Sequence, residues 1–166
     1  MNTTPDHGLA PNSSAAVPVT QADINLAVET LRDLAGWHIW PVRQETVTVD
    51  TAGDNVIFLP TLRLLQVHSL ALDDTPVDLD TIEWSESGMV RLKKRPRKGF
   101  RRITATILHG FENTPLAAVA MQMAARAHQP AANMQVGGIS VGAPGALTPY
   151  SSEWRLLDRY KLGPMP

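Results

Sequence analysis

The chain has 166 residues, of which 43% are hydrophobic, and a formal net charge of −1 at pH 7. This length suits one domain with a modest core, and no apolar stretch approaches the roughly 18 residues that span a bilayer, so no transmembrane helix is predicted. Because the sequence contains no cysteine, disulfides, thiolate metal sites and cysteine nucleophiles are excluded.

Charge is distributed unevenly along the chain. Eight of the fifteen Lys and Arg residues lie in the segment 91–102, which contains no acid. The rest of the chain holds seven basic and sixteen acidic residues. We therefore expect an acidic body that carries a basic tip, defined as residues 91–102. The basic residues of the tip are Arg91, Lys93, Lys94, Arg95, Arg97, Lys98, Arg101 and Arg102.

Residues 1–19 are rich in Thr, Pro, Asn, Ser and Ala and show no periodicity, which predicts an extended arm without fixed structure in a lone subunit. This segment lacks the basic start and the apolar core of a signal peptide, so we expect synthesis in the cytoplasm. One domain is expected to follow over residues 20–162, with a short tail at 163–166.

The domain begins with a predicted helix over residues 20–35. Thr20 is suited to cap it, Asp23 occupies the third helical position of a capping-box variant, and apolar side chains recur at helical spacing. Gly36 can adopt the left-handed conformation that closes a helix, and Pro41 prevents the helix from continuing.

Two of the four tryptophans, Trp37 and Trp40, lie directly after this helix. Indole rings bring a large apolar area with a single donor each, and no polar residues stand beside them at the spacing of a binding site. We therefore interpret residues 36–41 as a rigid corner that fixes the helix against a sheet. Within the corner, His38 is expected to be a hydrogen-bonded packing residue.

Alternating Thr and Val residues between turn-forming segments predict a small antiparallel β-module over residues 44–110, with about five or six strands. Helices are predicted at 115–129, capped by Thr114, and at 151–161. The Gly-rich segment 134–147 between them is expected to be a mobile loop or a short strand between breakers. The predicted fold class is α+β: an N-terminal helix, an inserted small antiparallel β-module, then two further helices packed as a small helical bundle.

No pattern in the sequence predicts catalysis, a cofactor or a metal site. The Gly-rich segment lacks the Lys-Ser/Thr pair of a phosphate loop, and there is no Gly-x-Ser-x-Gly nucleophile elbow. We therefore predict that the protein is not an enzyme. The five histidines are scattered, without the paired spacing of a zinc site: His7, His38, His68, His109 and His128.

The basic tip allows three interpretations. Eight positive charges within twelve residues, beside Gly99-Phe100, are able to neutralise phosphates and would make DNA binding strongly salt-dependent. The same charges suit an acidic surface of a neighbouring subunit, or they are simply solvated. Specific base reading is not expected, because strands flank the run and Pro96 and Gly99 interrupt it.

Several short motifs occur in the order found in one family. Leu34-Ala35-Gly36-Trp37-His38-Ile39-Trp40-Pro41 is followed by Glu45-Thr46-Val47-Thr48-Val49-Asp50, Asn55 to Leu64, Ile82-Glu83-Trp84-Ser85-Glu86-Ser87-Gly88 and the segment 103–111. Together they resemble the head-to-tail adaptor (head-completion, connector) proteins of long-tailed double-stranded DNA phages, over roughly residues 20–162. The chain departs from that family at Ala35, where a Cys is frequent, and in its longer arm.

The resemblance implies a structural virion protein at the head–tail interface, made in the host cytoplasm. Such adaptors form rings, typically of twelve copies, between the portal protein and the next connector or tail-completion protein. The genomic DNA passes through their channel without specific binding, and neither catalysis nor a membrane is involved. The runner-up hypothesis is a sequence-independent DNA-binding module that uses the basic tip.

The resemblance also implies roles for particular residues. Gly36 and Pro41 would set the geometry of the corner, and three tryptophans would anchor it: Trp37, Trp40 and Trp84. The terminal helix of such adaptors and its nearby loops face the portal, so the candidates for docking to the portal or a neighbour are Trp154, Leu157 and Tyr160. The alternative for these three residues is that they only cover the core.

Overall fold

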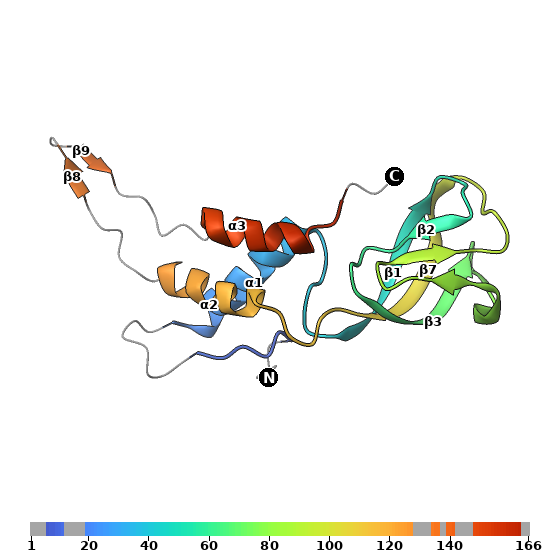
Figure 1. Cartoon of the computed structure of the whole chain (residues 1–166), viewed down its shortest axis with the longest axis horizontal. Coiled ribbons are helices and arrows are strands. Elements are labelled where there is room, and N and C mark those ends of the chain that lie inside the picture. The colour runs from blue at the N-terminus through green and yellow to red at the C-terminus, as the bar shows by residue number, and fades with distance from the viewer. Residues whose placement is uncertain (1–5, 12–18, 128–133, 137–138, 142–147, 164–166) are drawn as a thin grey trace. The chain divides into compact units, whose positions relative to one another are not determined.

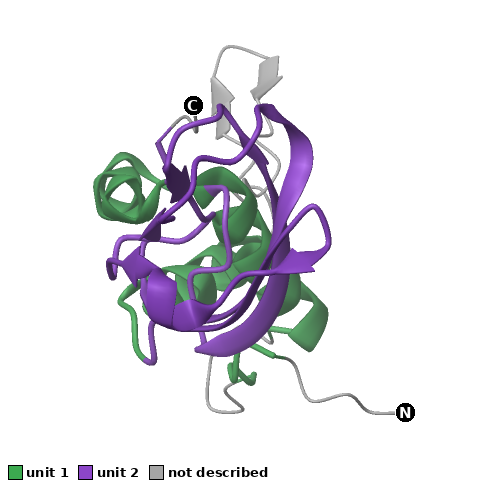
Figure 2. Cartoon of the chain, turned by 90° about the vertical axis from the view of Figure 1, so that its right-hand side faces the viewer, with its two compact units in different colours: residues 1–35, 113–161 green, residues 36–112, 162–166 purple. Residues whose placement is uncertain are grey.

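A computed structural model of the chain describes residues 6–11, 19–127, 134–136, 139–141 and 148–163 (Figure 1). The chain divides into two compact units, coloured separately in Figure 2. The first, here called the helical unit, comprises residues 1–35 and 113–161; the second, the β unit, comprises residues 36–112 and 162–166. The β unit is therefore largely an insertion between two helices of the helical unit.

The helical unit is built on α1 (Gln21–Ala35) and α2 (Leu116–Ala127), which pack against each other. The capping box of α1 is present as predicted: the backbone N–H of Thr20 donates to Asp23 Oδ2 at 2.9 Å, and that of Asp23 donates to Thr20 Oγ1 at 3.2 Å. The apolar stripe of α1 is fully buried. Periodicity and capping together therefore explain why this segment is a helix and which face it buries.

The C-terminal helix differs from the prediction. Helix α3 covers only Ser151–Leu157, and a 3₁₀ turn, η2 (Asp158–Tyr160), follows it and ends one residue before the predicted end. The predicted small bundle of helices is therefore wrong in its layout: α1 and α2 form the main pair, and the short α3 contacts α2. Helix α2 ends at Ala127, and the predicted last turn at 128–129 lies outside the described residues.

The arm has fixed contacts in the part that the structure describes. His7 is buried, and its Nε2 pairs with Asn25 Oδ1 on α1 at 2.9 Å while its Nδ1 accepts the N–H of Leu9. Asp6 forms an ion pair with Arg32, also on α1. The prediction of an arm without fixed structure is therefore wrong for residues 6–11, and residues 1–5 and 12–18 of the arm lie outside the described part.

The β unit contains two antiparallel sheets. The larger sheet has the strand order β1-β7-β3-β4 and the smaller has the order β2-β6-β5. The strands of the larger sheet are β1 (Arg43–Thr51), β3 (Leu64–Leu72), β4 (Thr75–Pro76) and β7 (Gly99–His109). Those of the smaller sheet are β2 (Val56–Phe58), β5 (Glu83–Trp84) and β6 (Met89–Arg91), with a 3₁₀ turn, η1 (Leu79–Thr81), before β5.

Both sheets contribute to one apolar core, because alternate residues of each strand point inward. Seven strands in two sheets exceed the single small module expected, so the α+β class and the antiparallel pairing are confirmed but the predicted size is wrong. The core residues are Val49, Ile57, Leu59, Leu64, Val67, Leu70, Val90, Leu92, Ile103, Ala105 and Ile107.

The Gly-rich segment contains a short antiparallel hairpin formed by β8 (Met134–Val136) and β9 (Ile139–Val141). The second strand coincides with the apolar run for which a short strand was one of the two expectations. Residues 137–138 and 142–147 of the expected loop lie outside the described part.

Candidate functional site

The corner is buried. Trp37 and Trp40 are 6% and 3% exposed, and Ile39 between them is fully buried. The indole of Trp37 lies 6.1 Å from the ring of His109 and 6.1 Å from that of Phe111, centroid to centroid. Tilted and edge-on contacts at this separation are favourable for aromatic rings, so Trp37 packs the two ends of the β unit together.

Backbone geometry fixes the same corner. Gly36 has a φ of +80°, the left-handed conformation that closes α1 without strain. Gly110 is constrained by space, because an added Cβ would lie 2.8 Å from the carbonyl oxygen of Pro41. His38 donates from Nε2 to that same carbonyl oxygen, and its ring lies 5.7 Å from the ring of His109.

An ionic group that the sequence did not reveal completes the corner: the half-buried Arg43 and Glu45 with the buried His109. Arg43 Nη2 donates to Glu45 Oε2 at 2.8 Å, and His109 Nε2 lies 3.0 Å from the same oxygen. Burial lowers the pKa of His109 despite the nearby carboxylate. Burial tends to raise the pKa of Glu45, but hydrogen bonds and charge from Arg43 and His109 outweigh it and hold that pKa below its usual value.

The sequence alone could have placed only two members of this ionic group together. Arg43 and Glu45 are two residues apart on one strand and so share a face. Their partner His109 lies on β7, where it pairs in register with Arg43. A single sequence does not specify that pairing, so the carboxylate and the imidazole were not brought together in the prediction.

Trp84 does not share the burial expected of an anchor of the corner. It lies on β5 in the smaller sheet, where it pairs with Val90, and its side chain is 42% exposed. Trp84 therefore differs from the buried Trp37 and Trp40, and its role as an anchor of the corner stays a prediction. A two-residue edge strand offers too few neighbours to enclose an indole.

The three residues predicted for partner docking differ in exposure. Trp154 and Tyr160 are half-buried, whereas Leu157 is fully buried. Leu157 therefore belongs to the core of the helical unit, as the alternative interpretation stated, and presents no docking surface in the isolated chain. Trp154 and Tyr160 remain candidates.

A second ionic group holds α3 in place. Arg126 on α2 forms two parallel hydrogen bonds with Glu153, each 2.8 Å long, and its guanidinium carbon lies 3.9 Å from the ring centroid of Tyr150. The hydrogen bond to Glu153 raises the pKa of Arg126. Burial by itself raises the pKa of Glu153, but the hydrogen bonds and charge of Arg126 and the backbone N–H of Tyr150 lower it by more, so the pKa is lowered overall. The 27 residues that separate Arg126 from Glu153 hid the pair from sequence analysis.

The basic tip runs from β6 through the connection to the start of β7, and most of its cations are exposed. Two of the eight have an acid partner in the chain: Arg91 pairs with Glu83 at 3.2 Å, and Arg102 pairs with Asp73. Among the described residues, the other six cations of the tip are exposed and form no ion pair. These are Lys93, Lys94, Arg95, Arg97, Lys98 and Arg101.

The root of the tip is held rigidly. Arg101 has a φ of +53°, rare for a residue with a side chain, and its backbone N–H donates to Asp50 Oδ1 at 2.7 Å. The backbone N–H of Asp73 donates to the carbonyl oxygen of Arg102 at 2.8 Å. Phe100 lies directly beside these contacts and is 86% exposed. The tip therefore presents an aromatic ring among cations from a fixed base.

Within the described residues, no group of three or more His, Asp or Glu side chains is arranged to hold a metal ion. None of the described helices is both long and apolar enough to cross a membrane.

No protein-family model matches the chain, and no curated protein matches it. Five chains of solved structures do, including the following two. A chain from the neck of the native gene transfer agent (GTA) particle, with C12 symmetry, aligns over 95% of this chain and 100% of its own length, with a TM-score of 0.54 and 16% identity. A chain from the neck of the empty GTA particle, with C6 symmetry, aligns over 87% of this chain and 80% of its own, with a TM-score of 0.52 and 17% identity. This chain therefore has the fold of proteins from the neck of GTA particles.

Proposed function

We propose that this protein is a structural component of the neck of a phage or phage-like particle, where it assembles into a homo-oligomeric ring and has no catalytic activity. One observation carries the proposal: nearly the whole chain, 95% of it, aligns with a neck chain solved with C12 symmetry. The ordered motifs of residues 20–162, which resemble phage head-to-tail adaptors, agree with it.

We further propose that the ring contains twelve copies, joins the portal to the next connector or tail component, and lines part of the DNA channel. A ring is built from heterologous contacts, in which one face of each copy meets a different face of the next. The uneven charge of the chain suits such contacts, because opposite charges on two faces favour every interface at once. Trp154 and Tyr160 are proposed to dock to the portal.

Negative-stain imaging of the full chain, alone and mixed with its assembled portal, tests the proposal. Rings in either sample, or decoration of the portal end, are the expected result. A protein that stays monomeric and unbound beside assembled portal would contradict it. Trp154→Ala with Tyr160→Ala is expected to weaken portal binding, and the exposed pair Asp54→Ala with Glu112→Ala provides the matched control.

The basic tip favours a second candidate, a sequence-independent DNA-binding module, because Phe100 lies together with six exposed cations that form no ion pair in the described part of the chain. Electrophoretic mobility shifts with duplex DNA at low salt test it. Affinity is expected to fall when Lys93, Lys94, Arg95, Arg97 and Lys98 are all replaced by Ser. A control that replaces Arg155, Arg159 and Lys161, exposed in the helical unit, should retain binding. Unchanged affinity without the tip cations would rule this candidate out.

A further inference from the structure

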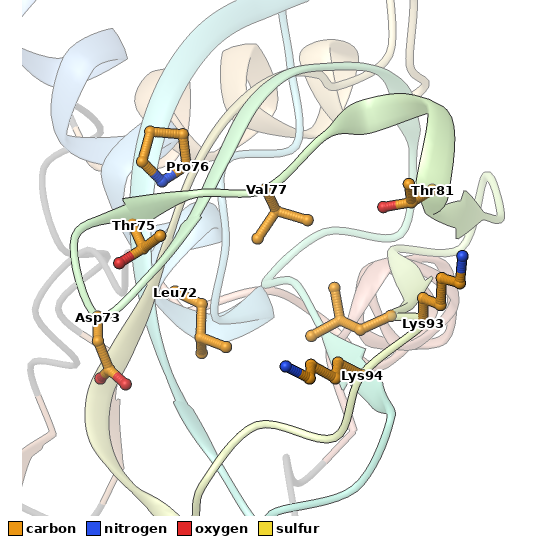
Figure 3. A pocket seen from close by; sticks show the side chains of 9 residues that line it. Leu72, Asp73, Thr75, Pro76, Val77, Thr81, Lys93 and Lys94 are labelled. Carbon is orange, nitrogen blue, oxygen red and sulfur yellow. The ribbon is translucent and has the colours of Figure 1, made fainter.

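A pocket of about 700 Å³ opens on the β unit beside the basic tip (Figure 3). It lies between the β3–β4 hairpin with the segment that follows it and the chain just after β6. Leu72, Val77 and Leu92 provide apolar walls, and Lys94 extends across the opening toward Leu72 in Figure 3. The pocket is thus an apolar recess with cations at its edge.

The charge around the recess is not balanced from within its lining. Lys93 and Lys94 are exposed and, in the described part of the chain, form no ion pair. Asp73 is the acidic residue among those that line the pocket, and its carboxylate is already paired with Arg102. A recess of this kind favours an apolar side chain that is flanked by carboxylates.

The outer face of α1 presents that combination. Leu26 is 48% exposed, whereas the apolar stripe on the opposite face of the helix is buried. Glu29 and Asp33 follow at spacings of three and four residues and therefore lie on the same face. Both acids are exposed, and among the described residues neither forms an ion pair.

We propose that Leu26 of one copy enters this pocket on the next copy, with Glu29 and Asp33 facing Lys93 and Lys94. The inference rests on the proposed ring and assigns one of its interfaces. The donor face belongs to the helical unit and the acceptor pocket to the β unit, so each copy gives one contact and receives one. The recess buries the apolar anchor, and the charges select the partner and the register.

A charge swap tests the contact on the full chain. The first variant carries Glu29→Lys and Asp33→Lys; the second carries Lys93→Glu and Lys94→Glu. Under the conditions in which the wild type forms rings, each variant alone is expected to lose about tenfold or more of the ring population, because like charges then face each other. An equimolar mixture is expected to regain rings, since opposite charges meet at every interface of an alternating ring.

Folding and general charge effects are controlled separately. All four positions are exposed, so each variant should keep the thermal midpoint and the circular dichroism spectrum of the wild type. The pair Asp54→Lys with Glu112→Lys makes the same change in net charge as the first variant, at exposed positions elsewhere, and should leave the rings intact. Rings that persist in both variants, or a mixture that fails to recover, would overturn the contact.

Cross-linking locates the contact directly, because the chain contains no cysteine. Leu26→Cys is combined in turn with Thr75→Cys, Val77→Cys and Thr81→Cys, three positions that line the pocket. Oxidation is expected to give a ladder of covalent oligomers in at least one pair. Cross-links confined to single copies, or none in any pair, would overturn the inference. If the wild type and the charge variants all form rings, the proposed contact is wrong but the proposed function still holds. If the wild type neither forms rings nor binds the portal, both the contact and the proposed function are wrong.

Discussion

The corner and the basic tip contain similar kinds of residue in different surroundings: the aromatic rings differ in burial, and the cations differ in whether they have a partner. In the corner, Trp37 is 6% exposed, and a cation, Arg43, is paired with Glu45 beside it. In the tip, Phe100 is 86% exposed among six cations that form no ion pair in the described part of the chain. Aromatic and charged residues therefore do not indicate a role by themselves. Their burial and their partners decide whether a change affects folding or contact.

The largest effect is expected at the corner. Trp37→Ala removes a buried indole that contacts His109 and Phe111, and it should lower the free energy of unfolding by about 3 to 5 kcal/mol. Urea denaturation followed by circular dichroism measures this. Trp84→Ala is the control, because that indole is 42% exposed, and its loss should cost about 1 kcal/mol or less. Equal losses of stability in the two variants would show that Trp84 contributes to folding as much as Trp37 does.

The ionic group of the helical unit extends the comparison to a buried charge pair. Glu153→Ala leaves the guanidinium of Arg126 without its two hydrogen bonds, in a place where the Glu153 side chain is only 8% exposed. A loss of about 3 kcal/mol in the free energy of unfolding is expected. The exposed Glu112→Ala should change stability by about 0.5 kcal/mol or less. A neutral Glu153→Ala would mean that α3 is held by apolar packing alone.

A smaller effect is expected from pH. The pKa of His109 is lowered in the folded state, so the unfolded chain binds more protons at mildly acidic pH. The contribution of His109 to stability is therefore complete above its ordinary pKa of 6.5 and declines as the pH falls below that value toward the lowered one. Urea denaturation at a series of pH values should show the decline, and His109→Gln should flatten it. His68→Gln, at an exposed position, should not.

The smallest change in stability is expected at the tip. Phe100→Ala should alter the free energy of unfolding by about 0.5 kcal/mol or less, because the ring is almost fully exposed. The same variant should reduce binding to whichever anionic partner the tip contacts, duplex DNA or an acidic protein surface, measured by mobility shift or by imaging of rings. A destabilisation as large as that of Trp37→Ala would show that Phe100 takes part in folding.

The sequence predicted local structure better than long-range pairing. The cap at Thr20 and the end of α1 at Ala35 depend on neighbouring residues and were confirmed. The division into two sheets depends on which distant strands pair, as when β2 meets β6, and periodicity carries no information on partners. The burial of Leu157 does not follow from the sequence for the same reason, because residue spacing shows which side chains share a helix face but not what packs against that face.

The candidate surfaces divide in the same way. The exposure of the tip cations followed from their density, since so many like charges are not buried together. The pocket beside Lys93 and Lys94 had no sequence signal, because its walls come from segments separated by about twenty residues. The contacts of His7 with α1 were also missed, since the composition of the arm resembles that of segments without fixed structure.

The hydrogen bond from the N–H of Phe111 to the carbonyl oxygen of Ile39, 2.9 Å long, joins the two ends of the inserted β unit. The 77 residues from Gly36 to Glu112 are therefore inserted into the helical unit in the way that a short loop would be, because the chain leaves and returns at adjacent positions. A module attached in this manner can be exchanged for a relative, or lengthened at its far turns, without new demands on the helices that carry it. The corner thus makes the chain modular: one unit can diversify while the other is preserved.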